Sequence, residues 1–266
     1  MKWEIIKNFS AKNMNFFSYQ EVIAEYPDTD RSYLSKVLAA MVSIGMLMKI
    51  YRNVYHILPL SADPGTYSPD GRLVAKYMMK DRDYYLAYSS AMYILGIRDQ
   101  PGFSTMAVTA RQVQPSLKHI AGTEVQFIYH SYSRFFGYEE MWVSNQEQAM
   151  VSDLEKTIVD AVSKPHLCGG IIELGKALYR SKERTDLQKL FYYLARNGSH
   201  AAKKRYLFLS DILRMKWTSE HERLLNEIGS SFSPLDPSEP DPGIKNSRFG
   251  LRINMEVNNL RDCVLP

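Results

Sequence analysis

Along the first sixty residues, the spacing of apolar side chains changes from a helical period to a strand-like one. Between residues 31 and 44 the apolar positions recur three and four residues apart, as in a helix with one buried face: Leu34, Val37, Leu38, Met41 and Ile44. We expect Gly45 to end this helix. Beyond it, apolar and polar residues alternate as far as Ile57, with Arg52 and Asn53 at the turn, which predicts a hairpin.

Two shorter helices are predicted before this one. The first covers residues 3–9 and the second residues 19–26, where Ser18 and Glu21 have the spacing of a capping box. A turn rich in aspartate follows and supplies the N-cap of the third helix. The order helix, helix, turn, helix, hairpin predicts a winged helix-turn-helix over residues 1–60.

The rest of the chain mixes helix-like and strand-like segments. Residues 61–72 are rich in Pro, Gly and Ser, and we interpret them as a linker. Beyond them we expect helices at 89–95, 152–162, 185–196 and 199–214, strands at 105–109, 124–129 and 249–257, and an extended loop at 233–243. Ser152 and Glu155 are expected to cap the second of these helices. The prediction is an α+β protein, with the winged helix-turn-helix followed by a larger mixed α/β C-terminal domain at 73–266.

Basic residues are concentrated where the winged helix would meet DNA. The chain carries a net charge of +4, and residues 31–60 contain four Lys and Arg but no Asp or Glu. A winged helix places its third helix in the major groove, where basic side chains hold phosphates and short polar ones reach base edges. We also expect the free N–H groups at the start of that helix to suit a phosphate. The predicted contacts to double-stranded DNA are Arg31, Ser32, Tyr33, Ser35, Lys36, Lys49, Tyr51, Arg52 and Asn53. The open alternative is a winged helix used only for protein contacts.

A second basic region lies in the C-terminal half. Residues 176–216 hold eleven Lys and Arg against three acidic residues. Such a run is commonly a solvated helix face. The alternative is a second phosphate-tracking surface, or a docking face for an acidic partner, formed by Lys176, Arg180, Lys182, Arg184, Lys203, Lys204 and Arg205.

Motifs of catalysis and cofactor binding do not occur in the sequence. It contains neither GxGxxG nor a P-loop, and neither GxSxG nor HExxH. Asp153 and Asp160 would share a helix face about 10 Å apart, too far to hold one metal alone. We expect no enzymatic activity, no cofactor and no metal. The six scattered histidines are expected at the surface or in turns: His56, His119, His130, His166, His200 and His221.

Cysteine usage and hydropathy bear on the compartment. Cys168 and Cys263 are far apart and have no CxxC spacing, so we expect two free thiols rather than a disulfide or a zinc site. The N-terminus lacks a signal-peptide pattern, and no apolar run approaches the roughly 20 residues of a membrane span. A soluble, cytoplasmic protein is predicted.

Several segments together resemble one known family. They are YRNVYHI at 51–57, SDLEKTIVDA at 152–161, KPHLCGG at 164–170 and KRYLFL at 204–209. In this order, within residues 16–254, they resemble AbiEi-type antitoxins of type IV toxin–antitoxin, or abortive-infection, systems. The resemblance implies an N-terminal domain that represses its own promoter, often at inverted repeats. It also implies a C-terminal domain that counteracts a nucleotidyltransferase toxin, in most members without a stable complex.

A different regulator is the alternative left open. A winged-helix transcriptional regulator could instead respond to an effector bound in its C-terminal domain. That alternative predicts a defined apolar pocket with few polar groups in this domain.

Overall fold

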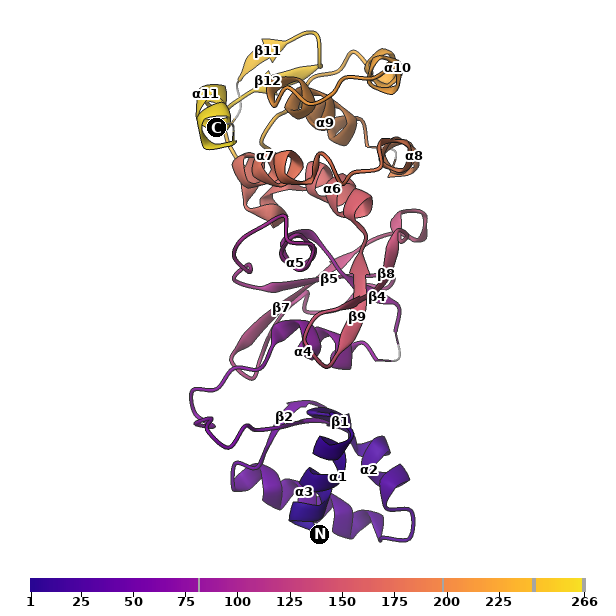
Figure 1. The fold of residues 1–266 in the computed structure, drawn as a ribbon, viewed down its shortest axis with the longest axis vertical. Helices are drawn as coiled ribbons and strands as arrows, with labels where there is room; N and C mark the ends of the chain where they lie inside the picture. Colours follow the sequence, from indigo (N-terminus) through magenta and orange to yellow (C-terminus); the bar gives the residue numbers. More distant parts are fainter. Residues whose placement is uncertain (81, 198, 241–242, 265–266) are drawn as a thin grey trace.

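The computed structural model describes residues 1–80, 82–197, 199–240 and 243–264, with the backbone alone for Asn259 and Cys263. Figure 1 shows three regions that follow one another along the long axis of the molecule. N-terminal helices with a small sheet lie at one end, a larger sheet in the middle, and helices with a third sheet at the other end. The mixture of helices and sheets confirms the predicted α+β class.

The N-terminal region contains every element predicted for it and one further strand. Its elements are α1 (Lys2–Ala11), β1 (Phe16–Ser18), α2 (Tyr19–Glu25), α3 (Arg31–Ser43), β2 (Leu47–Tyr51) and β3 (Val54–Ile57). The unpredicted strand, β1, pairs antiparallel with β3 and completes a sheet of order β1-β3-β2. Three residues are too few to show an alternating pattern, so the sequence carries little sign of this strand.

The predicted ends of the N-terminal helices are mostly correct. Ser18 and Glu21 form the capping box of α2, and Asp30 caps α3. Gly45 has a φ of +72°, the left-handed conformation that ends a helix. Ile44 was expected in the buried stripe, but its side chain is 58% exposed. It follows the last residue of α3, so the buried face of the helix ends before it.

The middle region is built on a six-stranded mixed sheet of order β6-β7-β5-β4-β9-β8. Its elements are α4 (Gly71–Met78), β4 (Tyr84–Leu86), α5 (Tyr88–Ile94), β5 (Thr105–Thr109), β6 (Leu117–Ile120), β7 (Thr123–Tyr129), a short 3-10 helix (Tyr132–Arg134), β8 (Tyr138–Trp142) and β9 (Gln148–Ser152). The strands predicted at 105–109 and 124–129 and the helix predicted at 89–95 are present. Helix α4 begins at Gly71, so the last two residues of the segment interpreted as a linker are helical.

The third region consists mainly of helices. Its elements are α6 (Leu154–Ser163), a 3-10 helix (Pro165–Cys168), α7 (Gly170–Ser181), α8 (Leu187–Asn197), α9 (His200–Ile212), α10 (Ser219–Glu227), β10 (Ser233–Pro234), β11 (Ile244–Asn246), β12 (Leu251–Ile253) and α11 (Val257–Val264). The predicted loop at 233–243 begins with a strand, and its residues 241–242 lie outside the described part. The strand predicted at 249–257 is shorter in the structure, where β12 covers only Leu251–Ile253 and α11 begins at Val257.

Three hydrophobic clusters hold these regions together. One lies within the N-terminal helices and includes Leu34 and Leu38. A second joins α4 to one face of the central sheet, and a third joins the other face of that sheet to the C-terminal helices. The second cluster also takes in Phe16, Ile50 and Val54 from the N-terminal sheet. The N-terminal region therefore packs on α4 through one face of its own sheet.

The predicted capping box of α6 is wrong. Asp153, not Ser152, is the N-cap, and its carboxylate accepts a hydrogen bond from the backbone N–H of Lys156. Ser152 is the last residue of β9, and its hydroxyl pairs with the Thr157 hydroxyl at 2.7 Å. Glu155 instead accepts the backbone N–H of Asp186. Ser152 and Asp153 can both cap a helix, and they stand side by side. The sequence alone does not show which of them ends the preceding strand and which caps the helix.

Two further expectations concern cysteines and membranes. Cys168 is a buried free thiol, as predicted, whereas the Cys263 side chain lies outside the described residues. Within the described ranges, the longest apolar helices fall short of what crossing a bilayer requires.

Candidate nucleic-acid interface

The residues predicted to contact DNA lie on α3 and on the hairpin of β2 and β3. All those on α3 are exposed: Arg31, Ser32, Tyr33, Ser35 and Lys36. On the hairpin, Lys49, Arg52 and Asn53 are exposed and Tyr51 is half-buried. The apolar stripe of α3 faces the N-terminal core, which leaves its polar face outward.

Tyr19, at the first position of α2, joins the two halves of this surface. Its backbone N–H donates to the Asn53 carbonyl in the hairpin turn at 2.7 Å. Its phenol hydroxyl donates to the Arg31 carbonyl at the start of α3, also at 2.7 Å. One residue therefore holds the hairpin turn and the N-terminus of α3 along a single edge. We call the four exposed cations of α3 and the hairpin, Arg31, Lys36, Lys49 and Arg52, the basic edge.

The cations of the basic edge are free of protein partners of opposite charge. None of these four side chains forms an ion pair with any residue of the described part of the chain. Arg52 does lie over the ring of Tyr51, 5.6 Å from its centroid. Unpaired and exposed cations keep their full charge available to a polyanion.

The start of α3 is less open than expected. The Asp30 carboxylate accepts a hydrogen bond from the backbone N–H of Tyr33 at 2.8 Å. This side chain occupies one of the N–H groups that we expected to suit a phosphate, and its negative charge lies at that helix end. Asp30 would therefore compete with a phosphate at this helix end, and whether a phosphate binds there stays a prediction.

Sequence reasoning missed the residues that connect the basic edge to the rest of the molecule. Lys80, just after α4, forms an ion pair with Glu21 of α2 at 2.6 Å. Asn15 donates a hydrogen bond to Gln146 at 3.1 Å. These pairs join residues 59 and 131 positions apart, and a local pattern carries no signal of such distant contacts.

The second basic region does not form the surface that its charge count suggested. Lys203, Lys204 and Arg205 are buried, the second of them completely. Arg205 donates to the carbonyl oxygens of Leu235 at 2.9 Å, Val162 at 3.0 Å and Pro234 at 3.1 Å. The Lys204 ammonium bonds the Ser231 carbonyl. Lys203 instead pairs with the Glu227 carboxylate at 3.3 Å. All three cations of α9 are thus engaged within the C-terminal region and do not form a phosphate-tracking surface.

The other four basic residues predicted to form that surface are nearer to solvent but engaged within the chain. Lys176 pairs with Glu173 at 2.8 Å, and Arg180 with Asp99 at 2.6 Å. The Lys182 ammonium lies 3.9 Å from the centre of the Tyr179 ring. Arg184 donates to the Leu95 carbonyl at 3.0 Å. All four of these side chains therefore have partners within the chain.

Three of the six histidines are buried, contrary to the expectation. His56 bonds the Tyr67 hydroxyl at 2.9 Å, and His221 caps α10 through Thr218. His130 lies between Tyr85 and Tyr88, whose hydroxyls are 3.1 Å and 2.9 Å from its two ring nitrogens. Burial is the main cause that lowers the pKa of His130 to about 4, and Asp160 works against it. These histidines are neutral structural groups at pH 7.

No set of three or more His, Cys, Asp and Glu side chains among the described residues is placed to hold a metal ion. Lys156 and Asp160 form a buried ion pair on α6, the helix where a metal was considered. That pairing gives both residues a structural role.

Comparison with known proteins gives a likeness in fold alone. No family model matches the chain, and no curated protein sequence matches it. Among solved structures, the chain is similar to the crystal structure of the RV2827C protein from Mycobacterium tuberculosis, with a TM-score of 0.70 at 13% sequence identity. The match covers 93% of this chain and 89% of that one. At this identity the two proteins share an α+β architecture over nearly their whole length.

Proposed function

We propose that residues 1–60 form a winged helix-turn-helix that binds double-stranded DNA through the basic edge. The observation that carries this proposal is the set of four exposed, unpaired cations along one edge of α3 and the hairpin. The order of α1, β1, α2, α3, β2 and β3 suits this class of domain. Ser32, Tyr33 and Lys36 are assigned to base edges, and Arg31, Lys49 and Arg52 to phosphates or the adjacent groove.

A mobility-shift assay with the DNA upstream of the protein's own gene tests this proposal. A labelled duplex of that region should be retarded, and an excess of unrelated duplex should compete less well than the unlabelled same sequence. If the unrelated duplex and the unlabelled upstream duplex abolish the retarded band at the same concentration, the protein binds DNA without sequence specificity. No retardation at low salt would refute DNA binding.

We further propose that the protein is an autorepressor and antitoxin, counteracting a nucleotidyltransferase toxin. This step rests on the resemblance to AbiEi-type antitoxins, and the C-terminal region would carry the antitoxin activity. We expect a nucleotidyltransferase gene beside the gene of this protein. Its product should be toxic when expressed alone and harmless when co-expressed with this protein. Continued toxicity in the presence of the folded protein would contradict it.

The alternative of an effector-binding C-terminal domain predicts a defined apolar pocket. A cavity of about 260 Å³ beside α4 is lined mostly by polar residues: Asp70, Arg72, Ser90, Ser104, Thr105 and Thr123. A second cavity, of about 340 Å³, is lined in part by Tyr77, Tyr84, Ala149 and Met150 but also by charged residues. Arg72 in the first cavity is already engaged by the Asp70 carboxylate at 2.5 Å. The basic edge therefore remains the better candidate for the principal binding site.

A further inference from the structure

An open cavity of about 570 Å³ lies between α1 and the segment that follows β3. Its lining is mostly apolar and includes Trp3 and Ile6 of α1, Met46, and Leu58 and Leu60 beyond β3. Among the described residues that line it, none is a Lys, Arg, Asp or Glu. The cavity is therefore a surface separate from the basic edge.

Apolar side chains of this cavity are left in contact with water. Trp3 is 68% exposed and Leu60 is 97% exposed. Covering apolar surface is favourable because it removes that surface from water. An apolar occupant would therefore be stabilised in this cavity.

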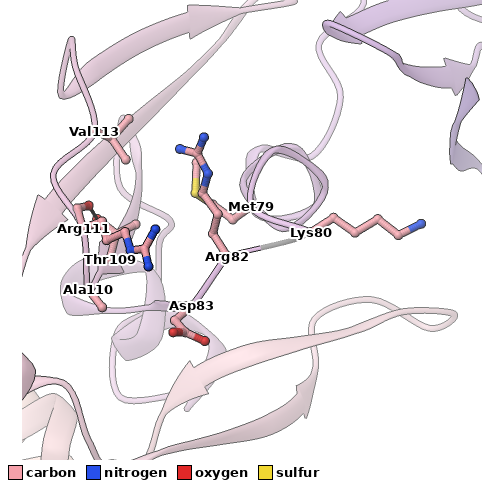
Figure 2. Close-up of a pocket in the computed structure, with 8 residues that line it drawn as sticks. All are labelled: Met79, Lys80, Arg82, Asp83, Thr109, Ala110, Arg111 and Val113. Atoms are coloured by element: carbon pink, nitrogen blue, oxygen red, sulfur yellow. Dashed lines mark hydrogen bonds between the residues drawn. The ribbon is translucent and has the colours of Figure 1, made fainter. Parts of the chain in front are cut away.

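The hollow of about 320 Å³ in Figure 2 has a different lining. Its lining residues include the charged side chains of Lys80, Arg82, Asp83 and Arg111. An apolar molecule would take water away from such groups without replacing its hydrogen bonds, which is unfavourable. An apolar ligand is therefore expected in the cavity beside α1 and not in this hollow.

Residues 57–67, which include the start of the segment interpreted as a linker, supply much of the wall of the cavity. The backbone N–H of Leu58 donates to the Met46 carbonyl at 3.1 Å. Pro64 packs on Gly45, where an added Cβ would lie 2.9 Å from the Pro64 Cγ atom. These contacts hold the wall in place, so the cavity is formed in the absence of a ligand, as is usual for small-molecule sites.

A chain of hydrogen bonds through Asn15, His56 and Tyr67 supplies polar groups to the cavity, which all three residues line. His56 Nδ1 lies 3.0 Å from the Asn15 carbonyl oxygen, which can only accept, so Nδ1 carries a hydrogen. Burial lowers the pKa of His56, so Nε2 keeps a free lone pair at pH 7. The Tyr67 hydroxyl, 2.9 Å from Nε2, therefore donates to it.

This chain leaves the Tyr67 hydroxyl without a hydrogen for a ligand. A phenol has one hydrogen to donate, while its oxygen keeps lone pairs that can accept. Burial also raises the pKa of Tyr67, so the hydroxyl keeps its proton. A ligand beside Tyr67 would thus be recognised through a hydroxyl or N–H group of its own.

We propose that this cavity binds an uncharged small molecule that is mainly apolar and offers one hydrogen-bond donor to the Tyr67 oxygen. An ion would lose its hydration here without gaining a charged partner among the described lining residues. Small-molecule sites combine apolar walls with a few polar groups and measure roughly 300–1,000 Å³, a range that includes this cavity. The proposal is independent of DNA binding.

The test follows the tryptophan side chains by NMR in the full-length protein labelled with ¹⁵N-tryptophan. Trp3 lines the cavity, whereas Trp142 and Trp217 are not among its lining residues. Trp3→Phe assigns the Trp3 signal. Indole and 1-methylindole serve as probes, because both are uncharged and aromatic but only indole has an N–H donor.

Indole should shift the Trp3 signal in a saturable manner and leave the signals of Trp142 and Trp217 in place. Its dissociation constant should be roughly 3- to 10-fold lower than that of 1-methylindole, the effect of one uncharged hydrogen bond. Tyr67→Phe removes the accepting oxygen and should bring the two dissociation constants to within about twofold of each other.

A matched pair of variants tests the cavity itself. Ala62→Phe adds a ring at a lining residue and should abolish saturable binding of both probes. Ala195→Phe adds the same ring at an exposed position of α8 and should match the wild type. The signals of Trp142 and Trp217 report whether each variant is folded.

Several results would overturn the proposal. Parallel, non-saturating shifts of every tryptophan signal would show non-specific contact, and unchanged binding in Ala62→Phe would place the probes elsewhere. Equal affinity of the wild type for the two probes would exclude recognition of a donor. A Trp3 signal that moves with protein concentration alone, together with a doubled mass in light scattering, would identify the cavity as a contact between two copies of the chain.

Discussion

At the scale of single residues, the structure separates charged side chains that look alike in the sequence. Arg31 and Arg52 are exposed and unpaired, whereas Arg205 is buried against backbone carbonyls. Lys156 is buried too, and its partner Asp160 lies one helical turn away. A basic residue therefore indicates a binding surface only where its helix faces solvent, and a count of charges along the chain does not supply that information.

Arg205 tests this distinction through stability. Replacing Arg205 with Met removes the donor from carbonyl oxygens of β10 and of the end of α6, which would stay buried without a partner. We expect the free energy of unfolding to fall by about 3 kcal/mol, at roughly 1–3 kcal/mol for each buried group left unsatisfied. Urea denaturation measures the change. Arg184→Met, at an exposed position, serves as the control and should cost much less; equal losses would argue against a special role for Arg205.

The histidine between two tyrosines makes stability depend on pH. The pKa of His130 in the folded protein is about 4, below the value near 6.5 of an unfolded histidine. The unfolded chain therefore takes up the proton first as the pH falls, and stability is lost between these two values. The full effect amounts to about 3 kcal/mol.

His130→Asn isolates this contribution. The free energy of unfolding of the wild type should decline more steeply between about pH 6.5 and pH 4.5 than that of the variant. The acidic residues common to both proteins contribute equally and cancel in the comparison. Parallel pH profiles for the two proteins would show that His130 is not held neutral by its surroundings.

At the scale of elements, local signals describe the N-terminal region well and the central sheet poorly. Helices α2 and α3 are predicted because Ser18 and Asp30 cap them and their apolar residues recur with a helical period. The strands β5 and β7 are found from their composition, but their parallel pairing is not. Strand β4 has only three residues and is buried throughout, so it shows no alternation that a sequence could display.

The capping box of α2 gives a prediction at this scale. The Ser18 hydroxyl accepts the backbone N–H of Glu21, while the Glu21 carboxylate accepts the backbone N–H of Ser18 at 2.6 Å. Ser18→Ala should lower the free energy of unfolding by about 1 kcal/mol, since it removes half of this exchange. Thermal denaturation checks the value. Ser10→Ala in α1, an exposed position without a capping role, should leave the midpoint nearly unchanged.

At the scale of the whole molecule, the N-terminal region is packed on α4 rather than tethered by a free linker. Phe16 stacks on Tyr77 with ring centroids 5.0 Å apart, and Lys80 pairs with Glu21. Composition alone suggested a linker over residues 61–72, because Pro and Gly mark a break in local structure but carry no information on which surfaces later pack together. The packing joins the N-terminal region and the central sheet into one connected body.

The central claim is that the basic edge binds DNA. The most direct measurement is the dissociation constant for the upstream duplex, determined by fluorescence anisotropy at one fixed salt concentration. It is compared between the wild type, the Arg31→Ala/Lys36→Ala/Arg52→Ala variant, and a control with Lys216→Ala/Lys245→Ala/Arg261→Ala, which removes the same charge from exposed positions of the third region. The account predicts a loss of about 2–4 kcal/mol, roughly 30- to 1,000-fold in affinity, for the first variant and little change for the control. Equal affinity of the first variant and the wild type would contradict it.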